Sequence, residues 1–438
     1  MYDIVVGRSE GDKQKYGLKG TILLAKHYVK MGQTTSLSNK VYMDITRSHV
    51  VFVCGKRGGG KSYTLGVIAE GLSSIPKEIA NNLSIILVDT MGIYWTMKYP
   101  NAKDAELLKE WGLKPEGLDI CIYTPEKFYH EYKKKGIPTD VPFTISVSDL
   151  QGSDWCMAFS YSESDQYGVL ISKTINDLLE KEELFDIDDI INYIKTDETA
   201  ESHVKFAVTN QFANAKKWGV FAKEGSHLKD LVKGGQVTVL DVSCYATMPN
   251  GWNIKSLVLG LLSQKLFEQR MIARKDEEFN QINQTVRFFG DDKQLHQEPL
   301  VWIVVDEAHE FLPNTGKTSA SDALITILRE GRQPGISLIL ATQQPGKIHT
   351  DVMTQSDIFL SHRITAKIDV DALSMLMQSY MRKGLDVELD NLPRVKGAGV
   401  IFDDTNEKMF PVRIRPRLTW HGGESPSAIP KGKKIEDF

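Results

Sequence analysis

Short apolar runs rich in β-branched residues recur along the chain, separated by polar stretches. Most of these runs are continuous rather than alternating, which is typical of strands buried on both faces of a parallel sheet. The runs cover residues 49–54, 84–89, 119–124, 143–148, 236–243, 301–307, 337–343 and 357–363. Residues 61–75 and 253–275 lie between such runs and have the apolar spacing of helices. The alternation predicts an α/β fold with a doubly wound, mainly parallel sheet.

One long stretch departs from this alternation. Between residues 149 and 233 the apolar positions fall three or four apart, which predicts a helical insertion of three to four helices. Residues 279–299 are polar and irregular and predict a surface loop. From Gly397 onward the tail alternates apolar and polar residues, which predicts a β-hairpin followed by an extended arm.

Composition narrows the class of protein. The 438 residues are 41% hydrophobic and 25% charged, as in soluble globular proteins. No apolar run approaches the roughly 18 residues of a membrane span, and the N-terminus lacks the apolar core of a signal peptide. The four cysteines lie far apart without metal-ligand spacing, which favours a reduced, cytoplasmic setting. A net charge of −4 argues against a broadly basic surface but allows a basic channel inside an assembly.

A glycine-rich segment follows the run at 49–54 and opens the helix at 61–75. Its sequence, GKRGGGKS, matches G-x-x-x-x-G-K-[ST] at every fixed position. The glycines let backbone N–H groups wrap phosphates, and the helix N-terminus adds a favourable dipole. Lys61 is expected to reach the β- and γ-phosphates of ATP, and the Ser62 hydroxyl to bind Mg²⁺. The residues expected to bind the nucleotide are Gly55, Arg57, Gly58, Gly59, Gly60, Lys61, Ser62 and Tyr63.

The run at 301–307 ends in two carboxylates, within the segment IVVDEAHEF. This is the pattern of a Walker B strand, in which Asp306 holds Mg²⁺ and Glu307 polarises the attacking water as general base. The letters DEAH also name a class of helicases. Those proteins place the box much nearer the P-loop lysine than it lies to Lys61 here, and they carry a downstream SAT motif that this chain lacks. The four letters are therefore incidental.

Two further elements fit a motor ATPase of the RecA-like class. The run at 337–343 ends in Gln343, and a polar residue at the tip of the strand beside Walker B can contact the γ-phosphate or the attacking water. Arg329 and Arg332 lie three apart on a predicted helix and share one face. They are either ordinary surface charges or an arginine finger, which reaches the γ-phosphate held by a neighbouring subunit. We predict that Arg332 is the finger, although the two assignments could be exchanged.

Together these segments resemble the HerA family of hexameric DNA translocases, which is related to FtsK. The resemblance rests on VFVCGKRGGGKSYTLGVIAEGL, VDEAHEFLP, ILREGRQPGISLILATQQPGKI and the tail VRIRPRLTWHGG, from about Val51 to Gly423. The order of the motifs, with REGR between Walker B and ATQ, is its specific part. The resemblance implies catalytic roles for Lys61, Glu307, Arg332 and Gln343, and metal binding by Ser62 and Asp306.

The resemblance also implies an architecture and an activity. The expected fold is a RecA-like P-loop core with a mainly parallel sheet, a helical-bundle insertion and a β-rich C-terminal arm. The expected activity is an ATP-dependent translocase or helicase on double-stranded DNA. It would work as a homohexamer with ATP and Mg²⁺, alongside a NurA-like nuclease or another effector subunit, in DNA repair or antiviral defence. The expected parts are a short N-terminal β segment (1–48), the core (49–148 and 234–396), the insertion (149–233) and the C-terminal hairpin and arm (397–438).

The chain departs from the family pattern at two places. Full-length HerA proteins carry an N-terminal β-barrel, whereas residues 1–48 offer room for two or three strands. Because that barrel is associated with partner docking, the identity of the partner is not carried over. Ile93 stands where those proteins often have an acidic residue, so the role of that carboxylate is not carried over either. Asp89, at the end of the run at 84–89, either caps the strand end or contacts the nucleotide.

Candidates for DNA contact are few. A ring translocase grips the duplex with loops that line its channel, mostly through phosphates. Lys317 in NTGKTS and Lys347 in QPGKIHTD fit such loops, and both also fit plain exposed lysines. We expect the tail arm and His421 to lie at a subunit interface or near the nucleotide, because its arginines alternate along a possible strand and share one face. These arginines are Arg413, Arg415 and Arg417.

Two other functions share every ATPase residue with the DNA motor. One is a ring whose nucleotide state gates an associated effector enzyme without moving DNA. The other is a secretion- or conjugation-type ATPase that moves protein or single strands, against which the lack of an apolar membrane segment counts mildly. Stimulation of hydrolysis by double-stranded DNA, together with roadblock displacement, separates the first of these from a DNA motor.

Overall fold

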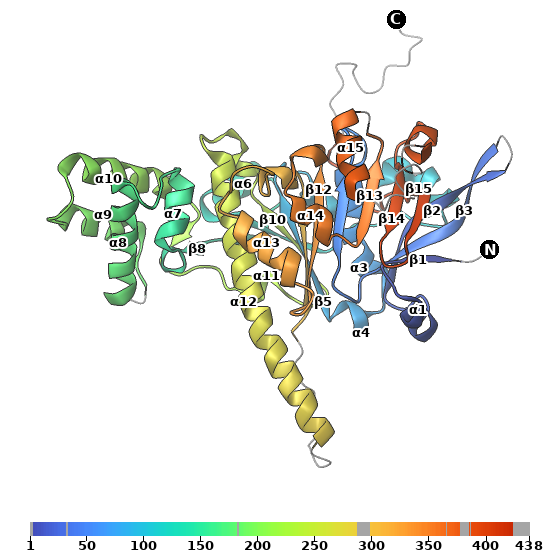
Figure 1. The fold of residues 1–438 in the computed structure, drawn as a ribbon, viewed down its shortest axis with the longest axis horizontal. Coiled ribbons are helices and arrows are strands. Elements are labelled where there is room, and N and C mark those ends of the chain that lie inside the picture. Colours follow the sequence, from blue (N-terminus) through green and yellow to red (C-terminus); the bar gives the residue numbers. More distant parts are fainter. Residues whose placement is uncertain are drawn as a thin grey trace, which may run out of the picture.

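The fold is organised around one large sheet that runs along the length of the molecule (Figure 1). The computed structural model describes residues 3–31, 34–181, 184–286, 298–364, 366–376, 385 and 387–423. Within these ranges the sheet has 13 strands in the order β1-β3-β2-β15-β14-β13-β4-β12-β11-β5-β10-β6-β7, and β8 and β9 form a separate pair. The strands are β1 (Ile4–Val6), β2 (Thr21–Met31), β3 (Thr34–Asp44), β4 (Val50–Cys54), β5 (Leu83–Asp89), β6 (Ile120–Pro125), β7 (Val141–Phe143), β8 (Ile145–Ser146), β9 (Phe221–Ala222), β10 (Val237–Asp241), β11 (Leu300–Val305), β12 (Ile336–Thr342), β13 (Ile358–His362), β14 (Ala398–Asp403) and β15 (Lys408–Ile414).

The part of the sheet from β13 to β7 is parallel throughout. All but one of the expected runs form strands of this part, which confirms the mainly parallel α/β fold. The run at 143–148 is the exception. It was expected to be one strand, but β7 pairs with β6 and β8 pairs with β9, because the chain leaves the sheet edge here to enter the helical insertion.

Helices cover both faces of the parallel part, and the burial of alternate strand residues shows why the runs are continuous. In β4, Phe52 packs into one apolar core, whereas Val51 and Val53 pack into the other. Every residue of β5 and β12 is buried. The helices are α1 (Glu10–Tyr16), α2 (Lys61–Ala69), α3 (Gly71–Ser74), α4 (Lys77–Ala80), α5 (Ala105–Glu110), α6 (Glu126–Lys135), α7 (Gly152–Phe159), α8 (Gln166–Lys181), α9 (Ile187–Thr196), α10 (Ser202–Lys216), α11 (Leu228–Leu231), α12 (Gly251–Val286), α13 (Ser321–Glu330), α14 (Thr350–Gln355) and α15 (Lys367–Leu376).

The two ends of the described chain meet in an extension of the sheet that is antiparallel except at its edge, where β1 lies parallel to β3. The expected C-terminal hairpin is present as β14 and β15, and β15 pairs with β2. β2 and β3 are long strands, and β1 pairs with β3 at the edge. A short helix, α1, was not expected; the Ser9 side chain caps its start by accepting from the Asp12 N–H. Residues 3–44 therefore extend the central sheet.

The helical insertion stands at one end of the molecule, to the left in Figure 1. Helices α7, α8, α9 and α10 pack around an apolar core that contains Trp155, Phe159 and Phe212. The short parallel pairing of β8 with β9 forms a neck, since it brings together the chain entering and the chain leaving this bundle.

A surface loop was expected at 279–299. This prediction is wrong for residues 279–286, because helix α12 continues unbroken to Val286. Its second half projects from the rest of the molecule (Figure 1). Side-chain pairs along the helix explain its extension through a polar sequence: Arg274 pairs with Glu277 and Glu278, three and four residues away. Residues 287–297 lie outside the described ranges. No helix within those ranges combines the length and apolar composition needed to cross a membrane.

Candidate active site

The loop between β4 and α2 has a shape that requires glycine. Gly58 and Gly60 have φ angles of 73° and 111°, in the region that residues with a side chain rarely adopt. Lys61 begins α2 with a buried side chain, and its Nζ lies 3.4 Å from the carbonyl oxygen of Lys56, to which it donates. The loop N–H groups and the N-terminus of α2 are therefore placed to receive an anion at the carboxyl end of β4.

A buried histidine on the neighbouring strand supports this loop, and sequence reasoning missed it. A Cβ on Gly55 would lie 2.7 Å from the Cβ of His362, which explains the glycine at that position. The two ring nitrogens of His362 bond to the Thr64 hydroxyl at 2.8 Å and the Ala398 carbonyl oxygen at 3.1 Å. Burial lowers the pKa of His362 to about 4, so the ring is neutral at physiological pH. No sequence motif marks this residue.

Ser62 and Asp306 come together from α2 and the end of β11. The Ser62 hydroxyl donates to Asp306 Oδ2 at 2.5 Å, and Asp306 is buried. A hydroxyl and a carboxylate are hard oxygen ligands of the kind Mg²⁺ takes, so the pair fits this ion. Within the described residues no group of three or more His, Cys, Asp or Glu side chains could hold a metal. An ion held here would therefore take its other ligands from water and phosphate oxygens, as Mg²⁺ commonly does.

Glu307 follows Asp306 and adopts a left-handed backbone conformation with φ 53°. Its Oε1 accepts a hydrogen bond from the Gln343 amide at 2.8 Å, so the two residues expected to act at the γ-phosphate are in contact. Its Oε2 is buried and has no hydrogen-bond partner in the described part of the chain. Burial, and then the charge of Asp306, raise the pKa of Glu307. A buried carboxylate oxygen without a partner can accept a proton from a water molecule.

Two more polar groups surround these carboxylates without having been expected. His309 contacts the end of β12 through the Thr342 hydroxyl, at 2.9 Å from its Nδ1. The Tyr94 hydroxyl is buried and has no partner within the described ranges, and its pKa is raised by burial and then by Asp306 and Asp89. His309 is the last residue of the DEAH segment, so its position beside Walker B could have identified it from the sequence.

Asp89 acts as a turn cap at the end of β5. Its carboxylate accepts backbone N–H bonds from Met91, Gly92 and Tyr94 at 3.2, 2.7 and 2.8 Å. Asp241 lies beside it on β10, and burial together with that neighbouring carboxylate raises the pKa of Asp89 to about 7. Asp89 was expected either to cap the strand end or to contact the nucleotide, and these bonds favour the capping role.

The two candidate finger arginines differ in their surroundings. Arg329 is ion-paired within the chain, with its Nη2 2.7 Å from Asp351 Oδ2. Arg332 is exposed, in the turn between α13 and β12. Gln343 follows the opposite end of β12, and a seven-residue strand spans roughly 20 Å. Arg332 is therefore remote from the nucleotide loop of its own chain.

The C-terminal arm is bound to α2 by a buried carboxylate. Glu70, Arg415 and Arg417 are almost fully buried, and the two arginines contact Glu70 at 2.7 and 3.3 Å. Of the two expected placements, a subunit interface or the vicinity of the nucleotide, the contacts of this pair with Glu70 inside the chain favour the second. The backbone N–H of Arg417 donates to the Tyr63 hydroxyl at 2.6 Å, which places the arm beside the nucleotide loop.

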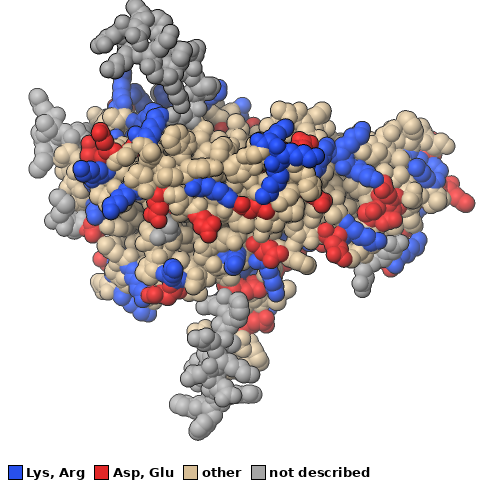
Figure 2. All heavy atoms as spheres, turned by 180° about the vertical axis from the view of Figure 1, so that it is seen from behind, with Lys and Arg blue, Asp and Glu red and all other residues tan. Residues whose placement is uncertain are grey.

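The two segments expected to contact DNA lie side by side. Pro313 and Ile348 form an antiparallel bridge, and the Asn314 N–H donates to the Lys347 carbonyl oxygen at 2.9 Å. The Lys347 side chain is exposed, and Lys317 pairs with Asp322 on the surface. Acidic and basic side chains are interspersed over the face shown in Figure 2, and neither sign covers it.

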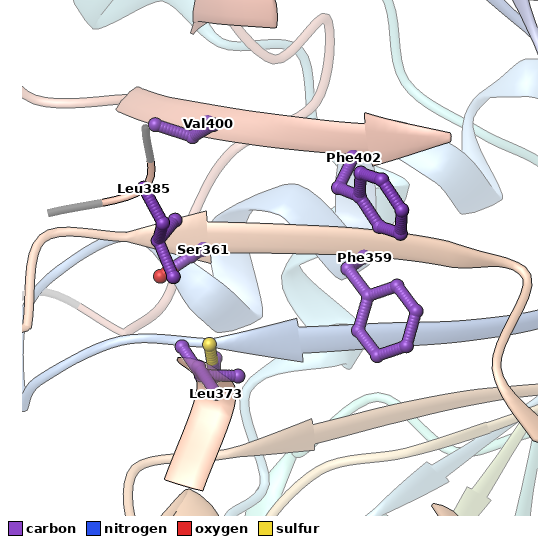
Figure 3. A pocket seen from close by; sticks show the side chains of 7 residues that line it. Phe359, Ser361, Leu373, Leu385, Val400 and Phe402 are labelled. Atoms are coloured by element: carbon purple, nitrogen blue, oxygen red, sulfur yellow. The ribbon is translucent and has the colours of Figure 1, made fainter. Parts of the chain in front are cut away.

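An apolar pocket behind the nucleotide loop carries no reactive chemistry. Figure 3 shows side chains of β13, β14 and α15, among them Phe359, Leu373 and Phe402, which line it. Cys54 also lies in its wall, where burial raises the pKa of the thiol to about 12 and keeps it protonated.

Comparisons with known proteins relate this chain to a family. A family model described as "Helicase HerA, central domain" matches residues 29–250. The DNA double-strand break repair helicase HerA of Pyrococcus furiosus is 28% identical over 196 residues, which are 42% of this chain and 33% of that protein. The probable HerA of Methanocaldococcus jannaschii is 29% identical over 133 residues, which are 28% of this chain and 25% of that protein. The matched region thus spans a third or less of the length of these relatives.

Two solved structures share the fold at low sequence identity. VirB4 of Thermoanaerobacter pseudethanolicus aligns over 90% of this chain and 97% of its own, with 12% identity and a TM-score of 0.52. The bacterial conjugative coupling protein TrwB aligns over 96% of this chain and 94% of its own, with 12% identity and a TM-score of 0.50. These matches support the α/β P-loop fold.

Proposed function

This chain belongs to the HerA family, and on that premise we propose that it is an ATP-hydrolysing ring motor that translocates double-stranded DNA. The observation that carries the proposal is the convergence of Ser62, Asp306, Glu307 and Gln343, where the carboxyl ends of β4, β12 and β11 meet the N-terminus of α2. Such a site joins a metal-binding pair to a carboxylate and an amide within reach of a γ-phosphate.

Each residue has a role that its position supports. Lys61 and the loop N–H groups would hold the phosphates, and Ser62 and Asp306 would hold Mg²⁺, which supplies charge neutralisation when bound. Glu307 would accept a proton from the attacking water through its unpartnered Oε2. Gln343 would orient Glu307 through their 2.8 Å hydrogen bond and contact the γ-phosphate side of the site.

A ring explains where Arg332 lies. The residue is exposed and remote from its own nucleotide loop, so it could act only on a nucleotide bound by another subunit. We propose a homohexamer in which Arg332 completes the neighbouring site, and a nuclease or other effector subunit as its partner. Arg329 is the weaker candidate because Asp351 already neutralises it.

The proposal is tested by two measurements on the assembled protein. Phosphate release is measured without DNA, with linear double-stranded DNA and with single-stranded DNA of the same length, and displacement of a protein block from the duplex is followed in parallel. A DNA motor shows faster hydrolysis with the duplex and ATP-dependent loss of the block. Glu307→Gln is the control for displacement by binding alone.

Hydrolysis that is indifferent to DNA, with the block left in place, would contradict translocation. That outcome would favour the ring that gates an effector enzyme, since both functions use the same ATPase residues. Stimulation by single strands alone would favour the conjugation-type ATPase.

A further inference from the structure

His309 connects the catalytic strand end to the chain that follows β12. The residue lies in the short turn η5 (Ala308–Glu310) and is buried. Its Nδ1 is 2.9 Å from the Thr342 hydroxyl and 3.7 Å from Glu307 Oε2, and its Nε2 is 3.2 Å from the Gln344 amide nitrogen. One imidazole ring thus touches the general base position and the two residues that flank Gln343.

These contacts hold the ring at both of its nitrogens. Nε2 faces the Gln344 amide and lies 3.5 Å from Glu310 Oε1, and Nδ1 faces Thr342 and Glu307. Burial lowers the pKa of His309, which favours the neutral ring. The backbone N–H of Gln344 also donates to the Thr342 hydroxyl at 3.0 Å, so Gln344 is bonded to Thr342 as well as to the ring.

Gln344 begins one of two loops that are joined to each other. We call residues 313–317 and 344–349 the paired loops. The Asn314 N–H donates to the Lys347 carbonyl oxygen at 2.9 Å, and the His349 N–H donates to the Leu312 carbonyl oxygen at 2.8 Å. The Asn314 side-chain amide donates to the Gly346 carbonyl oxygen at 3.2 Å. A displacement of Gln344 is therefore transmitted to both loops, because these bonds hold them together.

Glu307 is the residue through which a bound nucleotide would act on these contacts. Its left-handed backbone is rare for a residue with a side chain and is maintained by its surroundings. A γ-phosphate and a water bound in the site would act on the same Glu307 carboxylate and Gln343 amide that bond to each other here. Gln343 and His309 both contact Glu307. Gln344 follows Gln343 in the chain and bonds to His309.

We propose that His309 and Gln344 form a relay that couples the nucleotide state at Glu307 to the position of the paired loops. The proposal rests on the proposed function, because it takes Glu307 as the base. It makes His309 and Gln344 positioning residues, which act through the loops rather than on the nucleotide. The exposed Lys347 is the group that the relay would move against the polymer.

Amide hydrogen exchange of the paired loops tests the relay without DNA. Exchange is compared in the assembled wild type with ADP and with a non-hydrolysable ATP analogue, and then in His309→Ala, Gln344→Ala and the double variant. We expect a difference between nucleotides in the wild type, a several-fold smaller difference in each single variant, and no further loss in the double variant. His309→Asn, which keeps a donor and an acceptor, should restore part of the difference. Lys347→Ala is the control and should keep it.

Two results would overturn the relay. One is equal exchange of the paired loops in the two nucleotide states of the wild type. The other is an undiminished difference in His309→Ala, whose folding and nucleotide affinity are checked by thermal unfolding and titration of a fluorescent ATP analogue. DNA stimulation of hydrolysis is recorded separately. An exchange difference that needs His309, in a protein that duplex DNA does not stimulate, would contradict the DNA motor and support the relay.

Discussion

Lys61 and Glu307 serve different steps at the proposed nucleotide site, so their substitutions should separate binding from hydrolysis. Lys61→Ala removes the ammonium group that is expected at the phosphates, and we predict loss of nucleotide retention. Glu307→Gln keeps the shape of the side chain but cannot accept a proton, so it should retain ATP and lose turnover by a factor on the order of 10² to 10⁴. Filter retention of labelled ATP and phosphate release measure the two effects. Wild-type turnover in Glu307→Gln would remove the base assignment.

The protonation of His49 should make the free energy of unfolding depend on pH. The ring lies 2.5 Å from Asp357 and 3.6 Å from Asp44, and these carboxylates raise its pKa to about 9 against the opposing effect of burial. The folded state therefore holds a proton that the unfolded state releases near pH 6.5. This contribution is fully present below pH 6.5 and is lost as the pH rises through about 9. The loss is on the order of 3 kcal/mol.

The free energy of unfolding in urea at pH 6, 7.5 and 9 checks this expectation. His49→Gln should be less stable than the wild type at pH 6 and should lack most of the decline toward pH 9. The exposed His130→Gln is the matched control and should follow the wild-type profile. An unchanged decline in His49→Gln would assign the pH dependence to other groups.

Single residues also show what the sequence could reveal about the site. The P-loop glycines, Ser62 and Asp306 carry a spacing set by phosphate and metal chemistry, so the sequence alone is enough to recognise them. His362 supports the same loop from a strand about 300 residues later, through contacts that only the fold creates. His309 could have been recognised, since it adjoins Walker B, but its partners follow a different strand.

At the scale of elements, the local pattern of apolar residues was sufficient to predict strands and helices where tertiary packing agrees with that pattern. The buried parallel strands were predictable because burial on both faces leaves continuous apolar runs. Helix α12 was cut short in the prediction because its second half lacks an apolar face that packs, and its helicity depends on pairs such as Arg274 with Glu278. The connection of β15 to β2 was not predictable, since no local pattern specifies which distant strand is a neighbour.

Glu70 should hold the C-terminal arm in place. The carboxylate is fully buried and binds two guanidinium groups and the Thr419 hydroxyl. Glu70→Gln leaves the two arginines without a counter-charge, so we expect a loss of about 3 to 5 kcal/mol in stability. Because the arm contacts Tyr63, nucleotide affinity should also fall.

Thermal unfolding, proteolysis after the arm arginines and nucleotide titration follow these three effects. Glu78→Gln, on the exposed surface of α4, serves as the control and should change none of them. An arm that stays resistant to protease in Glu70→Gln would show that β15 alone secures it.

The helical insertion should be dispensable for nucleotide binding. Its helices pack around Trp155, Phe159 and Phe212 beyond the neck formed by β8 and β9, and the proposed phosphate and metal ligands lie outside it. Replacing residues 166–216 by a short flexible linker should leave ATP affinity within a few-fold of the wild type. Circular dichroism establishes that the shortened chain is folded, and titration measures the affinity. Loss of ATP binding in a folded variant would make the insertion part of the nucleotide site.

At the scale of the whole molecule, the position of Arg332 predicts complementation between subunits. Arg332→Ala should bind ATP and hydrolyse it slower by a factor on the order of 10³. Mixing Arg332→Ala with Glu307→Gln should restore activity, because some interfaces then combine an intact base with an intact finger. Arg329→Ala is the control and should retain most of the activity.

Subunit exchange is verified first with two labels, in rings shown to tolerate inactive sites. If such mixed rings stay inactive, the assignment in trans fails. If Arg332→Ala alone hydrolyses ATP normally, the residue is a surface charge.

The pairing of β15 with β2 has a consequence for synthesis on the ribosome. Arg415 bonds to the carbonyl oxygen of Leu23, and these residues are 392 positions apart. The edge of β2 therefore stays open until nearly all the described chain has been made, and an open strand edge is prone to pair with other chains. Nascent chains arrested before residue 408 should need chaperone protection, whereas those extended past residue 419 should resist aggregation. The Glu70 carboxylate, made early, stays without its arginines throughout that interval.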